Sequence, residues 1–215
     1  MIRYIYICVT VCLIALSSAG YAEEGGMIKL PAPVMAGGKP LMQALKERHS
    51  TREFSPRALS NQVLSNLLWA AAGVNRPESG KRTAPSARDW REIDIYVTLR
   101  EGVYRYDAND HVLLRVSKED LRASTGQQEF VGHAPLNLVY VADLTRMEGA
   151  SPEQKNLYSA ADTGFIAQNV YLFCASEGLA TVVRGSVDRE ALAAMLGLGK
   201  HQRIILAQTV GYPAR

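Results

Sequence analysis

Hydrophobic and polar positions along the chain follow two periods, which predict both helices and strands. Apolar residues recur at helical spacing in stretches that start or stop at capping residues such as Ser60, Gly73 and Gly178. Strict alternation is clearest from Ile93 to Leu99. The predicted helices span 41–48, 60–73, 152–176 and 188–196, and the predicted strands span 93–99, 103–106, 111–116, 136–142, 181–183 and 203–210.

The order of these elements predicts an α+β fold. Turn residues at 101–102 and 107–110 separate three consecutive strands, which indicates an antiparallel meander. Because helices and strands do not alternate strictly, a doubly wound parallel sheet is disfavoured. Ser117 and Asp120 resemble a capping box and predict a short helix through Arg122. The stretch 74–90 lacks apolar periodicity and is interpreted as a long ordered loop, a kind of segment that is often functional.

The N-terminal stretch has the order of a secretory signal. Arg3 precedes an apolar run over 4–16, and small residues lead to Ala22. We therefore expect a signal peptide at 1–22 and a single domain at 23–215, exported to the periplasm. The run is short for a membrane span, so we expect no stable membrane insertion after cleavage. The alternative is a tether to the membrane through an uncleaved N-terminus.

Composition excludes several classes of function. The chain has 215 residues, 47% of them hydrophobic and 21% charged, with a net charge of +3, as in ordinary globular proteins. This charge excess is too small to indicate a nucleic-acid partner. The four histidines are far apart in the sequence and no cysteine pair joins them, so we expect no metal site. Without the signal, Cys174 is the remaining cysteine, and its apolar surroundings predict a buried structural thiol.

Arginines interleaved with hydroxyl residues are the chemistry that stands out. They occur at 48–52, at 82–89 and at the terminal Arg215. Forked guanidinium groups and short hydroxyls are the groups that hold a phosphate. Arg and Ser at the end of a helix are, however, commonly solvated or paired with its last carbonyls.

The order of five motifs along the chain favours the phosphate-binding interpretation of these arginines over the solvated one. They are Arg48-x-Ser50-x-Arg52, the Pro85-Ser86-Ala87 loop before a strand, Asp162-x-Gly164-x-x-x-Gln168-Asn169, Gly178-Leu179 leading to Arg184-Gly185, and Gly211-Tyr212-Pro213. In this order they resemble the nitroreductase family over essentially all of 23–215. The resemblance implies an α+β fold with a central, mainly antiparallel sheet flanked by helices. It also implies an FMN-dependent oxidoreductase built as an intertwined homodimer, with the flavin sites in the subunit interface.

The resemblance also implies cofactor-binding residues, each by its match to a motif. The segment that holds the FMN phosphate and ribityl oxygens in the family is matched by Arg48, His49, Ser50 and Arg52. A loop that reaches the flavin across the dimer is matched by Pro85, Ser86 and Ala87. The turn whose backbone N–H faces flavin N5 is matched by Val183, Arg184 and Gly185, and a basic position that closes on the phosphate is matched by Arg215. Asp89 stands where many relatives have asparagine. Because a carboxylate only accepts hydrogen bonds, a flavin carbonyl opposite Asp89 is unfavourably placed unless Asp89 pairs with an arginine such as Arg88 or Arg91, and the family's substrate class and flavin potential do not carry over directly.

The implied activity is transfer of two electrons, as hydride, through the flavin to a small organic acceptor such as a nitroaromatic or a quinone. NAD(P)H is one candidate electron donor, although nicotinamide cofactors are cytoplasmic and the signal predicts export. We name no catalytic side chain because the flavin supplies the redox chemistry. Two alternatives remain: a flavin-dependent dehydrogenase of a peptide or heterocycle, and a non-catalytic flavin-binding module. The small residues around Gly164 suit packing against a symmetry mate or within one subunit.

Overall fold

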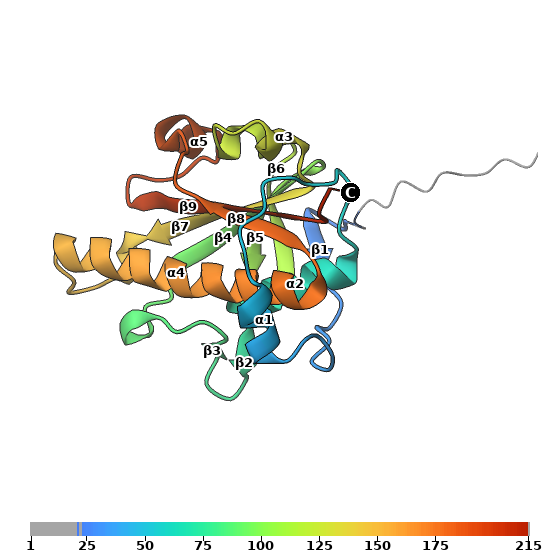
Figure 1. Ribbon diagram of the computed structural model, residues 1–215. Coiled ribbons are helices and arrows are strands. Elements are labelled where there is room, and N and C mark those ends of the chain that lie inside the picture. Colours follow the sequence, from blue (N-terminus) through green and yellow to red (C-terminus); the bar gives the residue numbers. More distant parts are fainter. Residues whose placement is uncertain (1–20, 22, 215) are drawn as a thin grey trace, which may run out of the picture.

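An antiparallel sheet forms the centre of the molecule (Figure 1). The computed structural model describes Tyr21 and residues 23–214, so the predicted signal lies outside the described residues except for Tyr21. Every strand pairing in the main sheet is antiparallel, which confirms the predicted α+β class. The spatial order of the strands is β1 (Met27–Lys29), β6 (Val112–Ser117), β5 (Gly102–Asp107), β4 (Ile93–Leu99), β7 (Leu136–Asp143), β9 (Gln202–Gly211) and β8 (Ala180–Arg184).

Helices cover both faces of this sheet, and their ends follow the predicted capping residues. The Ser60 hydroxyl accepts a hydrogen bond from the Val63 N–H, and Gly178 adopts the left-handed conformation that ends the longest helix. None of the helices in the described ranges is long and apolar enough to cross a membrane. The helices are α1 (Leu41–Glu47), α2 (Asn61–Ala72), α3 (Phe130–His133), α4 (Pro152–Glu177) and α5 (Arg189–Met195).

Two hydrophobic clusters lie on opposite sides of the sheet. Ile95 belongs to the larger cluster, which includes the buried faces of α2 and α4. Its neighbour Tyr96 belongs to a second cluster with Leu192 of α5. The strand β4 is therefore buried along its whole length, since successive side chains point to opposite, covered faces. Cys174 is buried in the larger cluster, as predicted, and burial raises the pKa of its thiol.

Two local predictions need correction. The stretch 74–90 contains a hairpin, β2 (Val74–Arg76) and β3 (Lys81–Arg82), and a 3₁₀ turn at Ala87–Asp89. The predicted helix through Arg122 is wrong. The Asp120 carboxylate accepts hydrogen bonds from the backbone and guanidinium of Arg122, and a 3₁₀ turn covers Arg122–Thr125. Short acidic side chains that bond to nearby backbone compete with helix formation in this way.

Candidate functional site

The first candidate segment runs from the end of α1 along the edge of β8. Arg48 leaves α1 in an extended conformation, and the Thr51 N–H donates to the Thr181 carbonyl at 3.0 Å. Since β8 is an edge strand, its outer backbone groups need partners. The Tyr171 hydroxyl of α4 supplies one by accepting the Val183 N–H at 2.9 Å.

Tyr171 contacts two of the predicted phosphate-binding residues, Arg48 and Ser50. The Ser50 and Tyr171 hydroxyl oxygens lie 2.8 Å apart, within hydrogen-bond distance. The Arg48 guanidinium lies over the Tyr171 ring, 5.2 Å from its centroid, in a cation–π arrangement. Tyr171 was not predicted as a site residue, because its place depends on the register of a long helix against a distant strand. The structure thus brings Arg48, Ser50 and Val183 together around one side chain.

Arg52 and His49 lie on the exposed side of the same segment. His49 Nδ1 lies 2.7 Å from the Glu47 carbonyl, so the ring is turned back toward the end of α1. Arg52 is exposed, and within the described ranges it joins no ion pair. The next residues pair with the C-terminal chain, where the Ala214 N–H donates to the Glu53 carbonyl at 3.3 Å. Arg215 itself lies outside the described residues.

The second candidate segment is the loop at 84–91, which forms hydrogen bonds with α4 and with Glu92, the residue before β4. The Ala87 N–H donates to the Asp162 carboxylate at 2.9 Å. The Ser86 hydroxyl accepts the Arg91 N–H at 2.8 Å and donates to Glu92 Oε2 at 3.3 Å. These bonds fix the backbone that carries Pro85, Ser86 and Ala87.

The tip of this loop is conformationally unusual. Arg88, Asp89 and Arg91 all have positive φ values, of 50°, 57° and 50°, which side chains other than glycine seldom adopt. The Asp89 carboxylate receives two hydrogen bonds from the Arg91 guanidinium, at 2.7 and 2.6 Å. Asp89 therefore pairs with Arg91, one of the two arginines considered as partners, and this pairing lowers the pKa of Asp89.

Two buried carboxyl groups, those of Glu92 and Asp162, accept hydrogen bonds from this loop. Glu92 is fully buried, and its Oε1 has no hydrogen-bond partner within the described chain. Burial, with the negative charge of the nearby buried Asp162, raises the pKa of Glu92. Sequence reasoning missed Glu92, because a single glutamate before a strand gives no signal of burial.

Arg184 and Gly185 end β8. The Arg184 side chain is only 4% exposed and points into the protein, where it donates to the Thr125 carbonyl at 2.7 Å and to Asn137 Oδ1 at 3.0 Å. Burial lowers its pKa to about 10. Only the backbone of this turn is therefore available to a ligand, which is the role that the resemblance implies. Gly185 is exposed.

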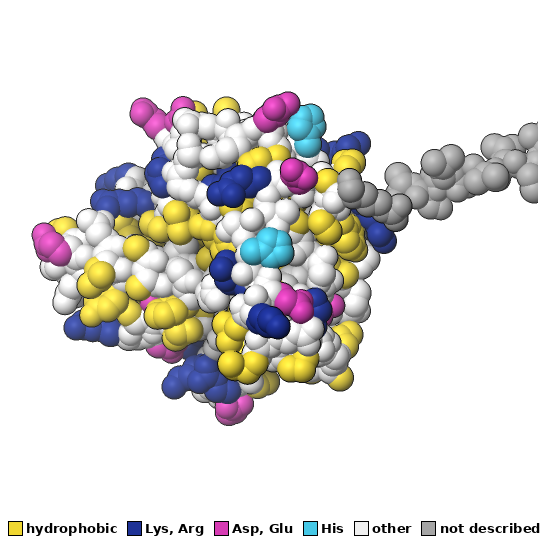
Figure 2. Space-filling model, viewed as in Figure 1, with side chains coloured by type: hydrophobic (Ala, Val, Ile, Leu, Met, Phe, Trp, Pro, Cys, Tyr) yellow, Lys and Arg dark blue, Asp and Glu magenta, His cyan; other side chains and the backbone are white. Residues whose placement is uncertain are grey.

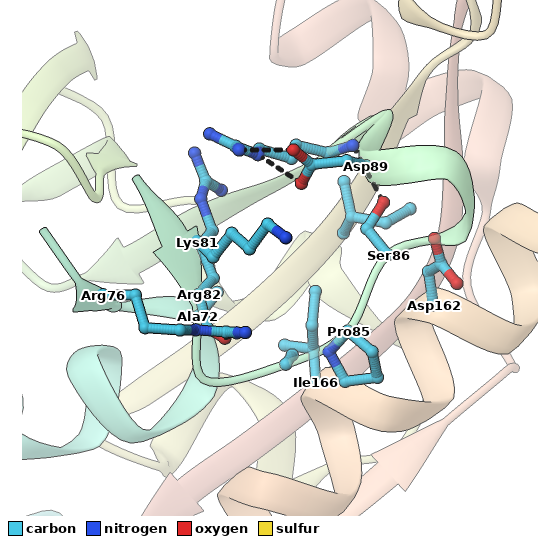
Figure 3. A pocket seen from close by; sticks show the side chains of 12 residues that line it. Ala72, Arg76, Lys81, Arg82, Pro85, Ser86, Asp89, Asp162 and Ile166 are labelled. Carbon is cyan, nitrogen blue, oxygen red and sulfur yellow. Dashed lines mark hydrogen bonds and ion pairs between the residues drawn. The ribbon is translucent and has the colours of Figure 1, made fainter. Parts of the chain in front are cut away.

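A cavity of about 320 Å³ opens beside the loop at 84–91 (Figure 3). Pro85, Ser86 and Asp89 line it, together with the β2–β3 hairpin and part of α4. None of the residues at 48–52 or 183–185 lines this cavity. Tyr171 and Asp162, which hold the two candidate segments, are nine residues apart on α4, or about 13 Å along the helix axis. One protomer therefore keeps the two segments apart.

Comparison with known proteins identifies the family of this chain. The family model "Nitroreductase family" matches residues 45–212, a range that includes both candidate segments. The chain belongs to the nitroreductase family. It is 31% identical over 176 residues to a candidate nitroreductase of Methanocaldococcus jannaschii, covering 77% of this chain and 88% of that protein. As a member of this family, the protein is an oxidoreductase.

Solved structures show the same nitroreductase fold. The crystal structure of a candidate nitroreductase from Ralstonia eutropha is 46% identical, with a TM-score of 0.85 and coverage of 94% of this chain and 93% of that chain. An NADPH:FMN oxidoreductase from Vibrio harveyi shares the fold with a TM-score of 0.60 at 19% identity, covering 81% of this chain and 69% of that chain. Within the described ranges, His, Cys, Asp and Glu form no group suited to holding a metal.

Proposed function

We propose that this nitroreductase-family protein binds FMN and passes two electrons, as hydride, to a small organic acceptor such as a nitroaromatic or a quinone. The observation that supports this proposal most directly is the placement of Arg48 and Ser50 against Tyr171 at the edge of β8, with the exposed Arg52 two residues further along the same segment. Guanidinium and hydroxyl groups suit a phosphate. The relative from Vibrio harveyi is an NADPH:FMN oxidoreductase, and this supports FMN as the cofactor here.

The residues present fit a flavin mononucleotide. Bound FMN would supply the hydride chemistry, and the protein would hold and orient it. Arg48, Ser50 and Arg52 would bind the phosphate and ribityl oxygens, with Arg215 closing from the adjacent C-terminus. The exposed Gly185 has no side chain, so a flat ring system could approach the backbone at the end of β8.

A homodimer would complete the site. None of the residues at 48–52 lines the cavity beside the loop at 84–91 in one protomer, so this loop would reach the flavin of the partner subunit. The exposed face of α4 suits such an interface: Leu157 and Phe165 are 64% and 48% exposed, and a Cβ added at Gly164 would meet nothing within 4 Å. Figure 2 shows hydrophobic side chains gathered over the region of α4 and α1.

The order of residues at 1–22 supports export to the periplasm. In that compartment an electron donor other than NAD(P)H would be needed, whereas retention in the cytoplasm would allow NAD(P)H. Fractionation of cells that express the full chain tests the location, and a mature N-terminus at Glu23 would support cleavage after Ala22.

The visible spectrum of the purified protein tests the proposed function. We expect flavin absorption, with FMN as the extracted cofactor, and rapid reoxidation of the chemically reduced protein by a nitroaromatic or quinone in stopped-flow experiments. Protein that stays colourless after incubation with FMN would contradict the proposal. Bound flavin that no acceptor reoxidises faster than free flavin would indicate a binding module instead.

A further inference from the structure

The cavity beside the loop at 84–91 carries an excess of positive charge. Its acidic side chains already have partners: Asp89 is bound by Arg91 through two hydrogen bonds, and Asp162 accepts the Ala87 N–H. The remaining charged groups that line it are the cations Arg76, Lys81 and Arg82.

These three cations have no carboxylate partner in the part of the chain that the structure describes. Arg76 donates to the Asn75 side chain and to the Arg82 carbonyl, and so is held at the rim of the cavity by uncharged groups. Figure 3 shows Arg76 and Lys81 projecting from the hairpin toward the side of the cavity that holds Pro85 and Ser86.

Arg82 is the most constrained of the three. Its Nε is buried and has no hydrogen-bond partner among the described residues. Burial, with the positive charges of Arg91 and Arg146, lowers its pKa. Because this Nε is out of solvent, a ligand in the cavity would meet the terminal nitrogens of the guanidinium, for which no hydrogen bond is seen among the described residues; an anion is the ligand that such charged donors favour.

The rest of the lining is apolar. Ala72, Ile93 and Ile166 come from α2, β4 and α4, and Ala84 and Pro85 complete this surface. A volume of about 320 Å³ is at the lower end of the range for small-molecule sites. The cavity thus combines a cationic rim with an apolar floor, in a space suited to one small ring.

We propose that this cavity binds a small organic anion, with a carboxylate held by Lys81 and Arg82 and an apolar ring against Ile93, Ile166 and Pro85. The cavity shares its wall with the loop predicted to reach the flavin. This inference rests on the proposed function: among nitroaromatic acceptors, whose nitro group takes up the two electrons, those that carry a carboxylate are preferred over neutral ones.

Calorimetric titration of the flavin-loaded protein with benzoate and with benzamide tests the binding step, since the two probes differ in charge but hardly in shape. We expect benzoate to bind at least tenfold more tightly, because a charged hydrogen bond contributes about 1.5–3 kcal/mol. Lys81→Gln and Arg82→Gln should each weaken benzoate binding about tenfold, and the control Lys200→Gln, which changes an exposed lysine outside the cavity, should not. Because Lys81 is exposed, its variant remains informative even if Arg82→Gln unfolds.

Several results would overturn the inference: equal binding of benzoate and benzamide, no binding of benzoate, or an equal loss in Lys200→Gln. Inorganic phosphate binding as tightly as benzoate would leave the apolar floor without a role and overturn the organic-anion assignment. Flavin absorbance shows whether benzoate releases FMN. If it does, the cavity belongs to the flavin site instead.

The acceptor preference is tested by kcat/KM for 4-nitrobenzoate and 4-nitrobenzamide. We expect the ratio to favour 4-nitrobenzoate and to fall about tenfold in Lys81→Gln. A ratio near one would overturn the inferred preference. Protein that cannot be loaded with flavin would contradict the proposed function, and the same benzoate titration of the flavin-free protein would still test the cavity. Flavin-loaded protein that does not bind benzoate would contradict this inference alone.

Discussion

The Tyr171 hydroxyl accepts the Val183 backbone N–H at 2.9 Å, which ties the middle of α4 to the edge of the sheet. The same oxygen lies 2.8 Å from the Ser50 hydroxyl. One phenol therefore sets the position of a strand edge and of the segment proposed to bind phosphate. Two parts of the candidate site that are far apart in the sequence depend on this group.

Tyr171→Phe should destabilise the protein and loosen its flavin. Without the hydroxyl, the Val183 N–H loses its partner in a half-buried place, which we expect to cost about 1–3 kcal/mol. Urea unfolding measures this loss, and flavin fluorescence measures retention. Tyr158→Phe, on the same helix, is the matched control, because no protein partner of the Tyr158 hydroxyl is seen in the described chain. Equal effects of the two variants would contradict the assigned role.

Arg52→Ala should weaken FMN retention by about 1–3 kcal/mol, since a charged hydrogen bond to phosphate is lost. Stability should change little, because Arg52 is exposed. Equilibrium dialysis against FMN measures the affinity, and Lys46→Ala on the exposed side of α1 provides a charge-matched control. Unchanged affinity in Arg52→Ala would mean that the phosphate lies elsewhere.

Glu92→Gln should change how stability depends on pH. The raised pKa of Glu92 means that, above the ordinary glutamate pKa of 4.5, the folded protein holds a proton that the unfolded chain has released. Wild-type stability is therefore lost as pH rises from about 4.5 toward the folded pKa, and the neutral amide removes this loss. Urea unfolding from pH 4 to pH 8 should show the variant gaining stability relative to wild type. A constant difference would contradict the assignment.

Arg184→Met should destabilise the protein strongly. The change leaves the Thr125 carbonyl without its buried side-chain donor and removes one of two donors to Asn137 Oδ1, which the Thr209 hydroxyl also reaches at 2.6 Å; we expect a loss of about 3 kcal/mol. Thermal and urea unfolding check this value. A loss of flavin without a loss of stability would instead place the side chain at the ligand.

Gly164→Val tests the proposed dimer. A side chain at this position meets nothing within its own protomer, so the helix should tolerate it apart from a modest propensity effect of under about 1 kcal/mol. In a packed interface the added methyl groups would clash, and light scattering should show a shift toward monomer. Ala191→Val, at an exposed site on α5, is the control. An unchanged dimer would exclude this face of α4 from the interface.

The sequence predicted most of the fold because its signals were local. Ser60 and Gly178 mark helix ends by their own chemistry, and alternation revealed the inward face of β4. The second face of β4 could not be predicted, since Tyr96 is covered by a helix from a distant part of the chain. The same limit explains why the sequence pointed to Arg48 and Asp89 as candidate site residues but not to Tyr171 or Glu92. The roles of Tyr171 and Glu92 depend on tertiary contacts.

The pairing of the C-terminal chain with 53–55 has a practical consequence. Ser55 and Ala214 take part in backbone hydrogen bonds that place the last residues beside the segment carrying Arg52. A purification tag fused after Arg215 would therefore emerge next to the proposed phosphate site, where a polyhistidine tail could compete for it. A tag that is removed by a protease before flavin binding is measured leaves the proposed phosphate site free.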